Sequence, residues 1–432
     1  MTGRYLAVGW GFGVRAHLFE SEDVMTNVTP SPVNNLAGRP SPDWLGPATQ
    51  TLPSDRFAGT LVGRVWNPDS GGPSPVVIRE AGVFDVSSNF ATVRDLCEQP
   101  NPSAAAMGAA GIFVGSFADV LANTDPEVRD ESRPWLLAPV DLQTLKAAGV
   151  TFAASLVERV IEERAHGDFE EAAQVRAQII AEIGRDLRDL KPGSEEAEKL
   201  KGLLIRRGLW SQYLEVGIGP DAEIFTKAPT LAAVGTAVPV GVLGTSTWNN
   251  PEPEVVLIVQ STGMIVGATL GNDVNLRDVE GRSALLLPKA KDNNASCAIG
   301  PFVRLFDGTF DLDCVRSLRV QLEIDGVDGF HLDGVSEMAR ISRDPIDLVA
   351  QLVGSHHQYP DGAALMLGTM FAPVVDRETP GMGFTHKEGD VVRISAGELG
   401  SLVNEVKKSE GCEPWLFGIS ALMRNLGTRN LL

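Results

Sequence analysis

The stretch that decides the fold is residues 251–273, which read PEPEVVLIVQSTGMIVGATLGND. An apolar run follows Glu254, turns around Thr262 and returns as a second apolar run that ends at Asp273. Two such runs around a short polar turn predict a β-hairpin. Alternate residues of a strand point to the same face, so Glu252 and Glu254 point together, and pairing across the turn sets Asp273 opposite Glu252. We therefore expect three carboxylates at the open end of the hairpin.

This carboxylate trio predicts a metal site. Three convergent oxygen ligands without a nearby cysteine or histidine suit a hard divalent cation. We predict that Glu252, Glu254 and Asp273 bind Mg²⁺, with Mn²⁺ or Ca²⁺ as alternatives. Pro253 cannot donate to a strand ladder, which fits a strand end left free for a metal. The other interpretation is a solvated strand end with ordinary surface acids, and the neighbouring segments argue against it.

Those neighbouring segments carry a family resemblance. They are EIFTK (223–227), GNDVNLRDVEG (271–281), KAKD (289–292), SCAIGP (296–301), LGT (367–369), GDVV (389–392) and LGSLVN (399–404). In this order they resemble the fumarylacetoacetate hydrolase superfamily over about residues 140 to 410. Members share a Glu-x-Glu strand, an Asn-Asp-x-x-x-Arg-Asp segment, a lysine and a Gly-Pro. The resemblance assigns the metal to the same three carboxylates.

The resemblance also implies roles for four further residues. Lys291 matches the active-site lysine, which acts as a base or stays charged and binds substrate oxygen. Thr369 matches the threonine that hydrogen-bonds the substrate carboxylate. Arg277 is expected in the charge network near the metal ligands, and Lys227 in contact with substrate.

One departure from the family pattern decides the expected reaction. Hydrolases of this family carry a His-x-x-Glu pair whose histidine activates water, but here Ser155 stands in the histidine's place while Glu158 is kept. A serine without a partner is a poor general base, so the resemblance favours proton removal and loss of a leaving group. The expected reaction is dehydration of a 2-keto-3-deoxy sugar acid, pentonate type, through a metal-stabilised enolate. Lys291 would take the proton, and Glu158 would help to protonate the departing hydroxyl.

Two other functions stay open at this stage. The first is a hydrolase that cleaves a C–C bond of a 2,4-dioxo acid, with His357 or His386 in place of the missing base. The second is a catalytically degenerate member that acts as a binding or structural subunit. The joint presence of the three carboxylates, Lys291 and Thr369 argues against degeneracy.

Composition limits the partners. The chain has 432 residues, 43% of them hydrophobic, and a formal net charge of −19. This charge argues against nucleic acid and against anionic membrane surfaces. Since apolar runs of about eighteen residues and a signal peptide are not apparent, we expect a cytoplasmic protein. Its four scattered cysteines are expected to be reduced thiols. The resemblance implies a homodimer acting on a small 2-oxo acid.

The chain is expected to have an α+β fold in three parts. Residues 1–55 are rich in Pro, Ser and Gly and predict a disordered or loosely packed extension. Residues 56–139 predict a small β-rich N-terminal domain, and residues 140–432 a catalytic domain. By resemblance this catalytic domain is a mostly β, mixed β-roll. Helical periodicity and an Asp168 capping box predict a helical insertion over 155–210.

Overall fold

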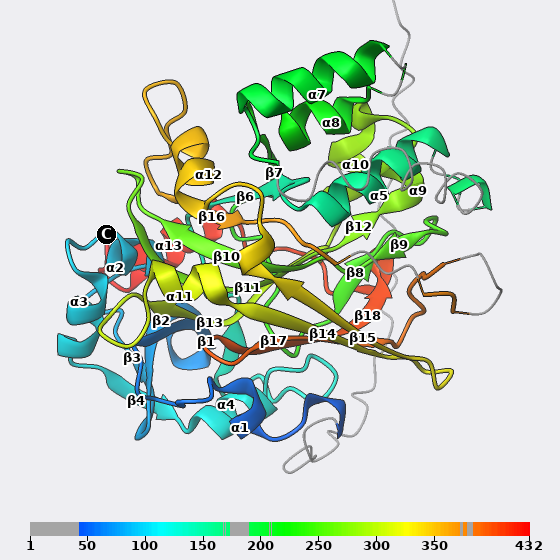
Figure 1. Ribbon diagram of the computed structural model, residues 1–432. Coiled ribbons are helices and arrows are strands. Elements are labelled where there is room, and N and C mark those ends of the chain that lie inside the picture. Colours follow the sequence, from blue (N-terminus) through cyan, green and yellow to red (C-terminus); the bar gives the residue numbers. More distant parts are fainter. Residues whose placement is uncertain are drawn as a thin grey trace, which may run out of the picture. The chain divides into compact units, whose positions relative to one another are not determined.

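The structure is a computed structural model of the 432-residue chain, and it describes residues 43–432 except 167, 169, 173–189, 207, 209, 372–374 and 378–382. The predicted α+β fold is confirmed, with mixed β-sheets and helices at their ends and edges (Figure 1). Among the described helices, none is long and apolar enough to cross a membrane. Residues 38–432 form one compact unit.

The larger sheet contains the predicted hairpin. Its strands, in spatial order, are β4 (Ile112–Gly115), β3 (Gly82–Asp85), β2 (Gly72–Arg79), β1 (Leu61–Asn67), β13 (Cys297–Leu305), β11 (Ile265–Asp273), β10 (Pro253–Val259), β16 (Ala363–Met366), β6 (Thr144–Gly149) and β7 (Glu223–Ala228). A further strand, β5 (Trp135–Leu137), pairs with β1. Within the described strands of this larger sheet, neighbouring strands pair antiparallel, except that β16 and β6 are parallel.

A second sheet covers one face of the hairpin. Its order is β15 (His331–Glu337), β14 (Arg319–Asp325), β17 (Val391–Ala396), β18 (Gly400–Lys408) and β8 (Val240–Val242), and a two-stranded pair is formed by β9 (Asn249–Asn250) and β12 (Asn275–Leu276). On β10, Val255 and Leu257 pack toward this second sheet, whereas Val256 and Ile258 pack into the core that includes β1 and β2. Both faces of β10 are therefore buried, which explains its continuous apolar run.

Helices close the ends and edges of the sheets. They are α1 (Ala48–Thr51), α2 (Val93–Cys97), α3 (Pro102–Gly108), α4 (Phe117–Ala122), α5 (Ala153–Arg164), α7 (Glu195–Arg206), α8 (Gln212–Ile218), α9 (Arg277–Glu280), α10 (Leu287–Lys291), α11 (Leu312–Ser317), α12 (Pro345–Leu352) and α13 (Ile419–Thr428). Short 3₁₀ turns are η1 (Asp43–Leu45), η2 (Pro68–Ser70), η3 (Ala284–Leu286), η4 (Met338–Arg340) and η5 (Ser409–Gly411).

The predicted insertion is helical in its described parts. Its helices α5, α7 and α8 gather beside β9, β12 and α9 (Figure 1). They share a small apolar core in which Leu156 and Ile161 of α5 pack with Leu204 of α7 and Leu214 of α8. The helical region begins at Ala153 and continues through α8, beyond the predicted end at residue 210. The middle of the predicted insertion, residues 173–189, lies outside the described residues.

The N-terminal boundaries differ from the prediction. Residues 1–42 lie outside the described residues, so the expected loose packing has no test there. The expectation fails for residues 43–55, because Leu45 and Leu52 are buried in one core with Leu61. The composition of this segment did not predict their burial, because the two leucines stand isolated among turn-forming residues.

The predicted small domain shares the main sheet. Strand β1 pairs with β13, with Leu61 opposite Arg304 and Val62 opposite Val303. Residues 56–139 therefore extend the catalytic sheet, and their ability to fold alone stays a prediction.

Candidate metal and active site

The hairpin brings the three predicted carboxylates together. Strands β10 and β11 pair with Pro253 opposite Asn272, and the Asp273 amide donates a hydrogen bond of 3.0 Å to the Glu252 carbonyl. Glu252, Glu254 and Asp273 each offer a carboxylate oxygen, and these oxygens lie within 4.8 Å of one another. The three residues are 5%, 3% and 2% exposed. The predicted register is confirmed, and the solvated-surface interpretation is wrong because the carboxylates are buried.

Lysines from two elements lie against these carboxylates. The Lys291 Nζ, at the end of α10, lies 2.5 Å from Glu252 Oε2 and 3.0 Å from Asp273 Oδ2. The Lys227 Nζ, on β7, lies 2.9 Å from Asp273 Oδ1. Glu254 accepts a 2.7 Å hydrogen bond from the Gly368 amide. Glu252 and Asp273 thus have cationic partners, whereas the contact described for Glu254 is to a neutral backbone group.

The pKa shifts show where negative charge is poorly compensated. Burial raises the pKa of Glu254 far above its usual value, and the Asp273 and Glu252 carboxylates raise it further. Burial also acts to raise the pKa of Asp273, but Lys227 and Lys291 outweigh it and hold that pKa low. A divalent cation beside Glu254 would compensate its charge. The buried all-carboxylate donor set therefore fits a hard divalent ion.

Lys291 is a cation in this arrangement. Burial by itself lowers the pKa of Lys291, but Asp273, Glu252 and Glu280 outweigh burial and raise it well above the usual lysine value. A lysine that keeps its proton binds anionic oxygen and is a poor base. The geometry therefore favours the second of the two roles expected for Lys291.

A third cation was missed by the sequence reasoning. Arg159 projects from α5, and its guanidinium contacts Glu252, Glu162 at 2.8 Å and Glu280 at 3.0 Å. Glu280 ends α9 and lies two residues after the Arg-Asp pair, within the family segment 271–281. The available signal for Arg159 was its position next to Glu158 in the predicted helical region. Its charged face turns toward the metal ligands because α5 packs its apolar face on α7 and α8.

Glu223 is the second missed residue. It opens β7 and lines the same cavity as the three metal-ligand candidates. Burial, followed by the Glu280 charge, raises the pKa of Glu223 to about 7. A carboxyl group with this pKa can both accept and donate a proton near neutral pH. Glu223 opens the EIFTK segment, from which the family resemblance implied a role only for Lys227.

The cavity at the three carboxylates is small. Its volume is about 20 Å³, and the groups around it include Ser155, Arg159, Glu223, Lys291 and Thr369. A space of this size holds about one water molecule. The described conformation is therefore closed, and a sugar acid requires side chains or the α5 segment to move.

Ser155 and Thr369 reach the cavity as predicted. The Ser155 hydroxyl donates a 2.9 Å hydrogen bond to the Phe152 carbonyl, one turn earlier in the chain. The Thr369 hydroxyl accepts a 3.1 Å hydrogen bond from the Phe371 amide. The hydroxyl hydrogen of Thr369 can therefore be donated to a ligand, whereas that of Ser155 is already donated to a carbonyl at the start of α5.

The other three predicted residues lie behind the cavity wall. Lys227 is completely buried, and besides Asp273 it contacts the carbonyl oxygens of Val274 and Lys291. The Arg277 guanidinium lies 2.6 Å from Glu162 and 3.4 Å from Glu158. These contacts are those of positioning residues. The substrate contacts predicted for Lys227 and Arg277, and the proton transfer predicted for Glu158, stay predictions.

The candidate replacement histidines lie elsewhere. The His386 side chain is buried, and its Nδ1 lies 3.2 Å from Asp390 Oδ2. His356 and His357 are exposed after α12, with ring centroids 4.8 Å apart and ring planes tilted by 56°. The groups described around the carboxylate cavity do not include these histidines.

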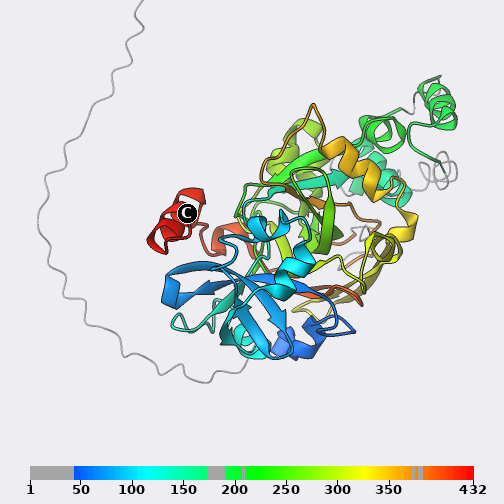
Figure 2. The same cartoon turned by 90° about the vertical axis from the view of Figure 1, so that its left-hand side faces the viewer.

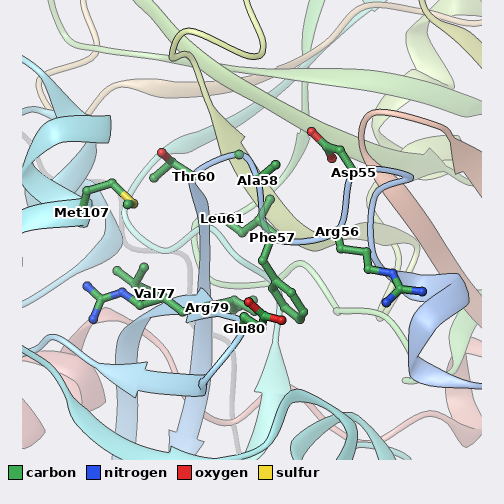
Figure 3. A pocket seen from close by; sticks show the side chains of 12 residues that line it. Asp55, Arg56, Phe57, Ala58, Thr60, Leu61, Val77, Arg79, Glu80 and Met107 are labelled. Atoms are coloured by element: carbon green, nitrogen blue, oxygen red, sulfur yellow. The ribbon is translucent and has the colours of Figure 1, made fainter.

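A second cavity, of about 470 Å³, lies between residues 55–61 and strand β2 (Figure 3). Two of its charged side chains, Asp55 and Arg79, are engaged with protein groups. Asp55 binds Arg304, and the Arg79 guanidinium donates to the carbonyls of Ala106 and Ala109 at 3.2 and 2.9 Å. This cavity has none of the convergent carboxylates of the hairpin.

Comparison with known proteins gives a consistent result. Residues 250–407 match the family described as fumarylacetoacetate (FAA) hydrolase C-terminal. A probable 2-keto-3-deoxyxylonate dehydratase of Haloferax volcanii is 32% identical over 194 residues, which are 45% of this chain and 63% of that protein. A 2-dehydro-3-deoxy-D-arabinonate dehydratase of Saccharolobus solfataricus is 31% identical over 186 residues, 43% of this chain and 59% of that protein. The chain thus spans about three fifths of the length of these curated relatives.

Solved structures extend the likeness in fold. A 2-keto-3-deoxy-D-arabinonate dehydratase in its apo form aligns with a TM-score of 0.57 at 20% identity, over 81% of this chain and 99% of that chain. A structure of 2-keto-3-deoxy-D-arabinonate dehydratase complexed with magnesium and 2,5-dioxopentanoate aligns with a TM-score of 0.56, also at 20% identity and with the same coverage. At this identity the likeness shows a common fold.

Proposed function

We propose that this chain is a divalent-metal-dependent hydro-lyase of the fumarylacetoacetate hydrolase family, because residues 250–407 match that family's C-terminal domain. Its substrate would be a 2-keto-3-deoxy sugar acid of the pentonate type, used in sugar acid catabolism. The observation that carries this proposal is the buried trio Glu252, Glu254 and Asp273 with Lys291 against it, beside a cavity in which Ser155 replaces the histidine of hydrolases.

In this proposal the protein binds the 2-oxo acid end of the substrate. Glu252, Glu254 and Asp273 would hold Mg²⁺, which supplies Lewis-acid stabilisation of charge on the 2-oxo oxygen when bound. Lys291, held as a cation, would donate to an anionic oxygen of the substrate. Thr369 would donate its hydroxyl hydrogen to the substrate carboxylate. These contacts fix C3 and C4 of the sugar acid within the cavity.

Dehydration then needs one proton transfer in each direction. The C3 proton leaves to a base, and the C4 hydroxyl leaves with a proton as water, which gives a C3–C4 double bond. A proton is then lost from C5 and one is gained at C3, and the resulting C4–C5 enol gains a proton at C4 and loses its hydroxyl proton to become the C5 aldehyde. Glu223 suits the proton transfers because it lines the cavity with a pKa of about 7. Glu158 was expected to help the leaving hydroxyl, but its contact with Arg277 favours Glu223 for this role.

The runner-up reaction is C–C hydrolysis of a 2,4-dioxo acid. One observation supports it, because Glu223 could also activate a water molecule. Ser155 argues against it, since its hydroxyl donates to Phe152 and gives water no base. The buried contact between His386 and Asp390 also argues against a substituting histidine. A non-catalytic binding role is the third alternative, and any metal-dependent turnover would exclude it.

The test offers purified protein with Mg²⁺ two substrate sets, 2-keto-3-deoxypentonates and acylpyruvates. We expect a semialdehyde from the first set, detected by coupling to a semialdehyde dehydrogenase. Lys291→Ala should lose this activity, whereas Lys289→Ala, exposed on the same short helix, should keep it. Pyruvate release from acylpyruvates without dehydration of the first set would replace the proposed function by the hydrolase.

We further propose a cytoplasmic homodimer. The net charge of −19 is compatible with small-molecule partners. The four cysteines are free thiols, as expected in a reducing compartment: Cys97, Cys297, Cys314 and Cys412. Light scattering on the purified protein tests the dimer by its mass, and cell fractionation tests the location.

A further inference from the structure

A separate cavity of about 700 Å³ lies beside the C-terminal segment. Its walls come from β1, β5, residues 231–239 and residues 412–417, which lead into α13. Figure 2 shows α13 at the outer edge beside the first strands, where the Asn425 side-chain amide donates 2.9 Å to the Ser70 carbonyl. The lining residues of this cavity and of the carboxylate cavity do not overlap. It is therefore a different site.

Aromatic rings form much of this cavity's wall. Trp66 and Trp135 are stacked, with ring centroids 5.7 Å apart and an interplanar angle of 15°. Phe417 meets Trp66 edge to face, with centroids 5.3 Å apart, and Trp415 also lines the space. A wall of this kind favours a flat apolar ligand body.

Arg64 brings a guanidinium with unpaired hydrogen-bond donors to the same wall. It lies two residues before Trp66 on β1, so both side chains leave the same face of the sheet. Arg64 is 6% exposed and lines the cavity, and its Nε and Nη1 are buried without a hydrogen-bond partner. A buried guanidinium without an acceptor is costly, so this group calls for a ligand.

The nearest acid does not neutralise Arg64 by contact. Burial lowers the pKa of Arg64, and the charge of Asp141 acts in the opposite direction. The Asp141 carboxylate, however, accepts hydrogen bonds from the backbone amides of Val93, Arg94 and Leu142, at 2.6, 3.0 and 2.7 Å. Within the described residues, the Arg64 guanidinium forms no ion pair or hydrogen bond with a carboxylate. Its donors are left for an added anion.

A second guanidinium stands at the same cavity. The Arg129 guanidinium lies 4.7 Å from the Trp135 ring centroid and 3.4 Å from Glu413, an exposed partner on the C-terminal segment. Glu131 also lines the space. Glu131 and Glu413 together offset the two guanidinium charges, so the attraction for an anion is local to Arg64, whose Nε and Nη1 lack hydrogen-bond partners. A single carboxylate matches this one guanidinium, whereas a phosphate dianion would be repelled by the two glutamates.

We propose that this cavity binds a small monocarboxylate with a flat apolar body, its carboxylate accepting hydrogen bonds from Arg64 and its body lying against Trp66 and Trp135. Guanidinium and carboxylate form strong charge-assisted hydrogen bonds. A cavity of about 700 Å³ is within the range of small-molecule sites. The ligand class differs from the polyhydroxy acids of the proposed reaction, which lack the flat apolar body.

The test measures binding of two probes of the same shape. Indole-3-propionate carries the carboxylate and indole-3-propionamide carries a neutral amide in its place. We expect calorimetry on the full chain to show the acid binding about tenfold or more tightly than the amide, because only the acid neutralises Arg64. Arg64→Met should remove this preference. It should also keep or raise the melting temperature, since an apolar chain replaces an unpaired buried charge.

The matched control is Arg79→Met on the neighbouring strand β2, whose guanidinium is engaged by the carbonyls of Ala106 and Ala109. It should leave the binding of the acid unchanged. Equal affinities for acid and amide, undiminished acid binding in Arg64→Met, or no acid binding at millimolar concentration would each overturn the proposal. Because the readout is binding at a cavity apart from the hairpin, the result does not depend on the proposed enzyme activity.

Discussion

Glu254 offers the sharpest test of the metal centre, because its charge destabilises the metal-free protein. Its pKa is raised by burial and by Asp273 and Glu252. A carboxyl whose folded-state pKa lies above its unfolded value costs stability at every pH above the unfolded value. At neutral pH, Glu254→Gln therefore removes a destabilising group from the metal-free protein. The Gln side-chain oxygen can still accept the hydrogen bond from the Gly368 amide.

The expected magnitudes follow from linkage. In wild type, Mg²⁺ at about one hundred times its dissociation constant stabilises the fold by about 2.7 kcal/mol. For a chain of this size, that free energy corresponds to a rise in melting temperature of about 3 °C. Glu254→Gln should lose most of this rise, because one of three carboxylate ligands has become a neutral amide. Without metal, its melting temperature should equal or exceed that of wild type.

Differential scanning fluorimetry with and without Mg²⁺, after treatment with a chelator, gives both quantities. Glu80→Gln, an exposed glutamate that follows β2, is the matched control and should keep the full metal-dependent rise. If Glu254→Gln kept the full Mg²⁺-dependent rise in melting temperature, the metal would not bind at the hairpin. A loss of several degrees in the metal-free variant would refute the argument from carboxylate repulsion.

Three further outcomes are expected. Arg159→Met should lower the metal-free stability by about 3 kcal/mol in urea unfolding, because buried Glu162 and Glu280 lose a cationic partner; an unchanged midpoint would show that those carboxylates are otherwise compensated. Deleting residues 1–55 should cost about 3–6 kcal/mol relative to deleting residues 1–42, since Leu45 and Leu52 lose their burial; equal melting curves would contradict the packing of 43–55. Burial lowers the pKa of His386 below its value in the unfolded chain, so folding favours the neutral imidazole. The free energy of unfolding is therefore highest above the unfolded pKa of this histidine and declines as pH falls below it. Unfolding midpoints at pH 7.5 and 5.5 should therefore differ more in wild type than in His386→Gln, and an equal difference would exclude this histidine as the cause.

The sequence predicted what depends on local pattern. The hairpin register followed from alternation and a short turn, and it correctly set Asp273 against Glu252. The motif segments also identified Lys291 and Thr369, which reach the site in the structure. Both kinds of inference need only spacing along one or two strands, or the order of segments.

The sequence could not predict what depends on packing between distant segments. Arg159 reaches Glu252 across 93 positions of the chain because α5 packs on α7 and α8. The raised pKa of Glu223 arises from burial and from the distant Glu280. Likewise, Lys227 was assigned to substrate on its motif alone, whereas its burial against Asp273 appears only in three dimensions.

Charge balance connects the metal to the substrate in this site. Glu252, Glu254 and Asp273 carry three negative charges when ionised, and Lys227 and Lys291 carry two positive charges in contact with them. A divalent cation would leave one positive charge in excess, and the carboxylate of a 2-oxo acid would neutralise it. Arg159 and Arg277 do not alter this balance, because Glu162 and Glu280 offset their two positive charges. A buried site of low dielectric strongly prefers such neutrality. Metal and a monoanionic substrate should therefore bind with positive coupling, each tightening the other.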